Sequence, residues 1–124
     1  MILNLLKSKI HRATVTEADL HYIGSITIDE NLMKSSGIIE YEKVEILNIT
    51  NGNRLETYVL KGERGSGCIK INGAAAHHVN VNDLIIIVSY CRLNHQEIKT
   101  HKPKIVHVNS TNQIISVHSD EMSA

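Results

Sequence analysis

The sequence contains no tryptophan, no phenylalanine and only four tyrosines among 124 residues. Isoleucine, valine and leucine must therefore fill the core, and this composition favours strands. Basic and acidic residues balance at 13 each, so there is no sign of a nucleic-acid partner or of a basic membrane-binding surface. The two cysteines, Cys68 and Cys91, are too few for a disulfide framework, which favours reduced thiols.

Long hydrophobic runs are also missing. The longest aliphatic run, residues 84–88, is far below the ~20 residues needed to span a bilayer. The apolar residues 1–6 are followed rather than preceded by charge and lack a small-residue cleavage site, so they do not resemble a signal peptide. We expect a soluble, cytoplasmic protein that forms a single domain over residues 1–124.

Short β segments separated by turns run along the chain. We expect strands at residues 9–16, 25–28, 44–50, 54–60, 68–71, 84–90, 105–108 and 114–117. Asn51-Gly52 is a strong hairpin signal between two of these strands. The pattern predicts a mainly β fold in the form of a small closed barrel.

Three further segments complete this prediction. Asp29 and Gly37 are suited to begin and end a brief helix over residues 30–35. Residues 72–77 should form a loop that runs into one helical turn, and residues 119–124 should be disordered. Residues 84–90 are apolar on both faces, which predicts the most buried strand.

The dipeptide Gly24-Ser25 lies in an apolar, β-branched context. A serine after a glycine can attack the preceding carbonyl group, which converts the amide to an ester, and elimination then breaks the chain. The new N-terminus would be a pyruvoyl group, a covalent cofactor made from Ser25. Glycine suits the first position because it has no Cβ to obstruct the attack and tolerates strained backbone angles. Alone, however, the dipeptide more often marks a tight turn.

Segments around this dipeptide closely resemble the aspartate 1-decarboxylase family. In order, they are Lys9–Ala13, Asp19–Ser25, Asn51–Tyr58, Glu63–Gly67 and Asn72–Ala76. Each is weak alone, but their combination in a chain of this length is specific. Leu55 and Glu56 replace residues that are common in the family, and the sequence after about Asn109 diverges.

The resemblance implies a double-psi β-barrel with short helices, assembled as a homotetramer. It implies autocatalytic cleavage between Gly24 and Ser25, which gives residues 1–24 and 25–124. The pyruvoyl cofactor would then form a Schiff base with L-aspartate and release CO2 and β-alanine for pantothenate synthesis. Whether a maturation factor assists the cleavage is left open.

The resemblance also assigns roles to site residues. Thr57 would stabilise the oxyanion during cleavage, and Tyr58 would protonate the carbon that loses CO2. Lys9 and Arg54 would bind substrate carboxylates. Thr57, Asn72, Gly73, Ala74 and Ala75 are further expected substrate-binding residues, with His11 and Tyr22 as lining residues. Because Thr57 and Tyr58 are adjacent, a regular strand would point them to opposite faces.

Other functions have weaker support. The eight histidines suggest a metal site, but no ligand spacing completes a zinc pattern. The adjacent His77 and His78 would rarely bind the same ion. No nucleophile-elbow pattern supports a Ser-His-Asp hydrolase. Two alternatives remain: a non-catalytic double-psi barrel that acts as a binding module, and a pyruvoyl decarboxylase of another acidic amino acid, such as glutamate.

Overall fold

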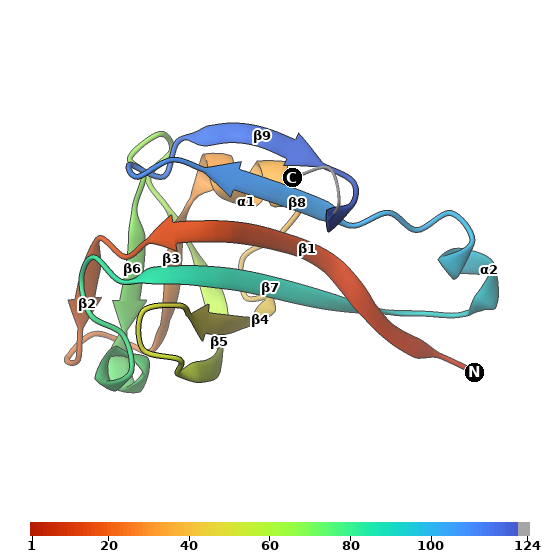
Figure 1. Ribbon diagram of the computed structural model, residues 1–124. Coiled ribbons are helices and arrows are strands. Elements are labelled where there is room, and N and C mark those ends of the chain that lie inside the picture. Colours follow the sequence, from red (N-terminus) through yellow and green to blue (C-terminus); the bar gives the residue numbers. More distant parts are fainter. Residues whose placement is uncertain (122–124) are drawn as a thin grey trace.

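The computed structural model describes residues 1–121 and confirms a mainly β fold (Figure 1). The elements are β1 (Leu3–Thr14), β2 (Glu17–Asp19), β3 (Ser25–Asp29), α1 (Glu30–Ser36), β4 (Lys43–Asn48), β5 (Arg54–Gly62), β6 (Ile69–Asn72), the 3-10 helix η1 (Gly73–His77), β7 (Leu84–Leu93), α2 (His95–Ile98), β8 (Lys104–Val108) and β9 (Ile114–His118).

The strands pair in the order β2-β6-β3-β5-β4-β7-β1-β8-β9. The pairs β1–β8, β2–β6 and β3–β5 are parallel, and the other pairs are antiparallel. The sheet forms a small barrel, and its mixed pairing is compatible with the double-psi topology that the family resemblance implies.

The long antiparallel pair β1–β7 extends beyond the rest of the sheet. It pairs Leu3 with Leu93 at one end and Thr14 with Leu84 at the other. Figure 1 shows the N-terminus and α2 at the projecting end, whereas β2, β3, β6 and η1 gather near the opposite end. The Gly24-Ser25 bond therefore lies in the part of the molecule away from the projecting end.

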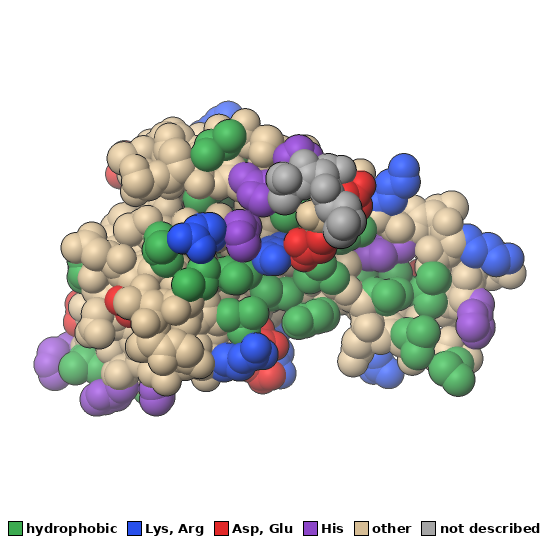
Figure 2. All heavy atoms as spheres, viewed as in Figure 1, with side chains coloured by type: hydrophobic (Ala, Val, Ile, Leu, Met, Phe, Trp, Pro, Cys, Tyr) green, Lys and Arg blue, Asp and Glu red, His purple; other side chains and the backbone are tan. Residues whose placement is uncertain are grey.

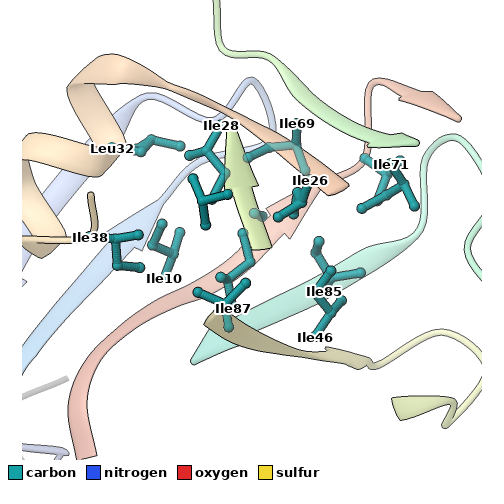
Figure 3. Packing of buried hydrophobic residues seen from close by; sticks show 14 of the residues in the cluster. Ile10, Ile26, Ile28, Leu32, Ile38, Ile46, Ile69, Ile71, Ile85 and Ile87 are labelled. Atoms are coloured by element: carbon teal, nitrogen blue, oxygen red, sulfur yellow. The ribbon is translucent and has the colours of Figure 1, made fainter. Parts of the chain in front are cut away.

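Branched aliphatic side chains fill the core in place of large aromatic ones. Figure 3 shows isoleucines from β1, β3, β4, β6 and β7 packed together with Leu32 of α1. The most buried strand is β3, with Ile26 and Ile28 fully buried. The prediction that residues 84–90 form the most buried strand is wrong, because Leu84 and Ile86 are only half-buried and Tyr90 is exposed.

The predicted caps of α1 are confirmed. The Asp29 side chain accepts a 2.8 Å hydrogen bond from the Asn31 N–H, and Gly37 ends the helix in the left-handed conformation. The buried Asp29 carboxylate also accepts hydrogen bonds from the backbone N–H groups of Gly65, at 3.0 Å, and Gly67, at 2.8 Å. One carboxylate thus fixes the end of β3, the start of α1 and the loop before β6.

Some predicted boundaries differ from the structure. β1 begins at Leu3, well before residue 9, because its first half pairs with the end of β7. β2 and α2 were not predicted, although Asn94 and Glu97 form a capping box at α2. The expected disorder is wrong for residues 119–121, where Glu121 lies 3.2 Å from the Lys9 Nζ. Residues 122–124 lie outside the described part.

Both cysteines, Cys68 and Cys91, are free thiols in the structure. Within residues 1–121, no helix has the length and apolar character required to cross a membrane.

Candidate active site

Ser25 is the first residue of β3 and is the centre of the candidate site. It is 1% exposed and has a φ of 134°, a conformation that residues with a Cβ rarely adopt. It pairs with Asn72 of β6, whose Nδ2 donates hydrogen bonds to the Oγ of Ser25 at 3.3 Å and the Oγ1 of Thr27 at 3.2 Å. The hydroxyl of Ser25 is therefore oriented by a buried carboxamide on a strained backbone.

The close approach of backbone segments beside Ser25 depends on Gly73, the first residue of η1. A Cβ at Gly73 would lie 2.7 Å from the Cα of Gly24, and the φ of Gly73 is +66°. Gly24 itself has a φ outside the left-handed region, and a Cβ there would meet no heavy atom within 4 Å. An unobstructed Cβ position at Gly24 agrees with the reason given for glycine there, whereas the positive φ lies at Ser25 and the crowding at Gly73.

A cavity of about 300 Å³ reaches the Gly24-Ser25 bond. Its walls come from the start of β3, the first half of β5, the end of β6 and the η1 segment. The lining residues are Gly24, Ser25, Leu55, Glu56, Thr57, Tyr58, Asn72, Ala74, Ala75 and His78. The fold thus brings most of the residues proposed from the sequence to one cavity.

Thr57 and Tyr58 both line this cavity, although they are adjacent on β5. Burial alternates along the strand: Leu55 and Thr57 are half-buried, whereas Glu56 and Tyr58 are exposed. This alternation agrees with side chains on opposite faces. The two residues still share one cavity because it lies against this part of β5.

Lys9 and Arg54 do not line the cavity. The Lys9 Nζ lies 3.2 Å from a carboxylate oxygen of Glu121, and Lys9 pairs with Val88 and Ile105 on neighbouring strands. The Arg54 side chain is 72% exposed and lies 3.7 Å from a Glu45 oxygen. Within the described chain, therefore, neither proposed carboxylate-binding cation reaches the cavity that contains Ser25.

His11 and Tyr22 also lie outside the cavity lining. The His11 ring packs edge-on against His107, with ring centres 5.3 Å apart. Burial lowers the pKa of His11, and the positive charges of Lys9, His107 and Arg12 lower it further, whereas Glu121 opposes them. Tyr22 is exposed and lines a separate pocket of about 210 Å³, whose wall also includes Asn72.

Sequence reasoning missed three lining residues: Leu55, Glu56 and His78. Glu56 lies at the cavity and also forms a 2.9 Å ion pair with Lys43 of β4. His78 comes two positions after the small-residue segment 73–76, and this position is the signal that could have identified it. Among residues 1–121, no cluster of three or more histidine, cysteine or acidic side chains could hold a metal ion.

Comparison with known proteins shows the family of this chain. Residues 1–115 match the family model described as aspartate decarboxylase. The aspartate 1-decarboxylase of Caldicellulosiruptor saccharolyticus is 60% identical over 98% of this chain and 94% of its own length. The enzymes of that name from Acetivibrio thermocellus and Clostridium kluyveri are 59% and 56% identical, over 98% and 94% of this chain and 96% and 92% of their own lengths. The chain belongs to the aspartate decarboxylase family.

Proposed function

We propose that this chain is the precursor of a pyruvoyl-dependent enzyme that converts L-aspartate to β-alanine and CO2, the β-alanine serving pantothenate synthesis. Relatives that carry the name aspartate 1-decarboxylase, at 60% and 56% identity over nearly the whole chain, support this substrate and reaction. The observation that carries the proposed maturation is the buried Ser25 at a φ of 134°, beside a cavity that also contacts Thr57 and Tyr58.

Cleavage would begin at the hydroxyl of Ser25. Its Oγ forms a bond to the carbonyl carbon of Gly24 while the Gly24-Ser25 amide bond breaks, which leaves an ester and a free amine. Elimination then removes the Cα proton of residue 25 and breaks its Cβ–O bond, which releases residues 1–24 with a terminal carboxylate and leaves dehydroalanine. Hydrolysis of this group by water releases ammonia and leaves the pyruvoyl ketone. Strain at Ser25 favours breaking this bond, and a hydroxyl at Thr57 can stabilise the oxyanion.

The site fits a group of this kind. The 300 Å³ cavity reaches Ser25, and Ala74 and Ala75 contribute only small side chains to its wall. When formed, the pyruvoyl group supplies the electron sink that makes loss of CO2 feasible. Asn72 would orient the substrate, and Tyr58 would donate a proton to the carbon that has lost CO2.

The positions of Lys9 and Arg54 support a site that is completed by another subunit. Both cations lie away from the cavity of their own chain, as their contacts with Glu121 and Glu45 indicate. We therefore include in the proposal a homotetramer in which Lys9 and Arg54 bind substrate carboxylates at the site of a neighbouring subunit. Assistance of cleavage by a maturation factor is a separate part of the proposal.

Intact mass spectrometry under denaturing conditions tests the maturation. We expect two products, residues 1–24 and residues 25–124, with a carbonyl group and no free amine at the start of the larger one. Ser25→Ala should stay uncleaved and inactive. A wild-type chain that stays uncleaved after incubation, heating and exposure to cell extract would contradict the proposal and favour the non-catalytic binding module.

The reaction itself is tested by CO2 release from L-aspartate and L-glutamate. We expect release from aspartate alone, whereas release from glutamate would favour the alternative substrate. Tyr58→Phe should cleave normally but decarboxylate poorly, since it keeps the ring and lacks the proton donor. Normal turnover by Tyr58→Phe would remove Tyr58 from this role.

A further inference from the structure

The cavity beside Ser25 contains one residue that can carry a positive charge. Of the residues that line it, only Glu56, Tyr58 and His78 have titratable side chains, and of these only His78 becomes cationic. Lys9 and Arg54 are elsewhere in the described chain. A dicarboxylate that enters this cavity would therefore meet a single cationic candidate among residues 1–121 of the chain that supplies Ser25.

The backbone of His78 is held in place from the neighbouring hairpin. Its carbonyl oxygen accepts hydrogen bonds from the side-chain Nδ2 atoms of Asn48 at 3.2 Å, Asn51 at 3.0 Å and Asn53 at 3.4 Å. Its N–H donates to the carbonyl of Ala75 at 3.0 Å. An exposed residue with this many backbone contacts has a fixed position relative to the cavity.

The hairpin end of this arrangement is itself anchored by buried groups. Asn48 and Asp83 are both nearly inaccessible to solvent. The Asn48 Nδ2 also donates to the Asp83 Oδ2 at 2.8 Å, and the same oxygen accepts the Asn80 N–H at 2.8 Å. The Asn48 carboxamide therefore binds the His78 carbonyl from a buried, hydrogen-bonded position.

We propose that His78 is a substrate-binding residue whose imidazole binds one carboxylate of the dicarboxylate substrate, at the site of its own chain. This inference rests on the proposed function, and it adds a contact that none of the sequence motifs assigns. An imidazole N–H can donate a hydrogen bond to a carboxylate and binds it more strongly when protonated. Figure 2 shows histidine side chains at the corner of the molecule where Figure 1 places η1.

The adjacent histidine provides a matched control. His77 is the last residue of η1 and is exposed like His78, but it does not line the cavity. A substitution at either position removes one imidazole from the same segment. The contacts that hold His78 use its main-chain atoms, so His78→Ala leaves its carbonyl acceptor for Asn48, Asn51 and Asn53 in place.

The test uses the cleaved enzyme as wild type, His78→Ala, His78→Lys and His77→Ala. Steady-state kinetics give KM and kcat for L-aspartate, and calorimetry gives the Kd of succinate, an unreactive dicarboxylate. For His78→Ala we expect KM and Kd to rise about tenfold, the effect of losing one hydrogen bond to a charged group. The kcat should change less than about twofold if binding alone is lost. His78→Lys should recover most of the affinity, and His77→Ala should match wild type.

Three results would overturn this assignment. The first is a KM and a succinate Kd for His78→Ala that equal those of wild type. The second is an equal loss in His77→Ala and His78→Ala. The third is a failure of both His78 variants to cleave while His77→Ala cleaves, which would assign His78 to maturation. Failure of the proposed function is distinct, because it would appear as a wild-type chain that neither cleaves nor releases CO2.

Discussion

Gly73 is the position where one added methyl group should most disturb the proposed cleavage site. A Cβ built there lies 2.7 Å from the Cα of Gly24, 2.9 Å from its nitrogen and 3.1 Å from the carbonyl oxygen of Tyr22. All of these are backbone atoms, so no side-chain rotation can relieve the contact. Gly73→Ala must therefore move η1 away from the residues that precede Ser25, or move those residues themselves.

The expected cost follows from two effects. Alanine at a left-handed φ such as the +66° of Gly73 costs about 1–2 kcal/mol, and an extra methyl group in a close-packed position costs about 1–3 kcal/mol. Together they predict that Gly73→Ala lowers the free energy of unfolding by about 2–5 kcal/mol. Gly24→Ala is the matched control, because a Cβ there meets no heavy atom within 4 Å and the φ is not left-handed.

The comparison is made in a Ser25→Ala background, which keeps every chain intact. Urea unfolding, monitored by circular dichroism, gives the free energy of unfolding of Gly73→Ala and of Gly24→Ala. Any effect of alanine on the unfolded chain is common to these two variants. In the Ser25 background, mass spectrometry should show slower cleavage for Gly73→Ala than for wild type. Equal stabilities for Gly73→Ala and Gly24→Ala would refute the packing of η1 against residues 22–24.

Two further predictions concern stability in acid. Burial raises the pKa of Glu42, but hydrogen bonds from Lys7, Ser89 and a backbone N–H outweigh burial and leave this pKa below its ordinary value. The Glu42 carboxylate thus stabilises the fold above its unfolded pKa of about 4.3, and this stabilisation is lost as the pH falls through the folded pKa. The free energy of unfolding in urea should therefore fall less between pH 7 and pH 3 for Glu42→Gln than for wild type. Burial and the charge of Lys9 lower the pKa of His11, so its neutral form stabilises the fold and wild type should lose stability as the pH falls below about 6.5. His11→Gln should remove this loss. A free energy of unfolding that falls as much between pH 7 and pH 5 in His11→Gln as in wild type would contradict the assignment of the loss to His11.

Local signals in the sequence were enough for much of the scaffold around the site. The caps at Asp29 and Gly37 and the hairpin at Asn51-Gly52 depend on residues close together in the chain, so the sequence places them well. β2 and the first half of β1 depend on pairing with distant strands, and no local pattern determines them. The same distinction separates the predicted from the unpredicted features of the site.

The presence of Ser25 at a strand start was predicted, but the location of the strain was not. Glycine at position 24 was expected to tolerate backbone strain, but the positive φ occurs at Ser25, where pairing with Asn72 holds it. The contact of Gly73 with Gly24 joins residues far apart in sequence and could not be read from either segment. His78 was missed although it lies near a small-residue segment, because its place at the cavity of Ser25 arises only when η1 packs against the residues before β3.

The separation of Lys9 and Arg54 from the cavity leads to a prediction about assembly. If a neighbouring subunit supplies these cations, Ser25→Ala and the double variant Lys9→Ala/Arg54→Ala should each be inactive alone. Co-expression should restore activity, because a hybrid site can combine an intact Ser25 with intact cations from its neighbour. With random mixing, about one site in four has this combination, so we expect about a quarter of wild-type activity.

A site built from one chain gives a different result in the same experiment. No chain in the mixture carries both Ser25 and the two cations, so the mixed assembly would have no complete site. Different affinity tags on the two variants allow mixed assemblies to be isolated, and native mass spectrometry establishes that both are present. Inactive mixed assemblies would therefore refute the shared site. Full activity of Lys9→Ala/Arg54→Ala alone would also refute it, because the site would then need neither cation.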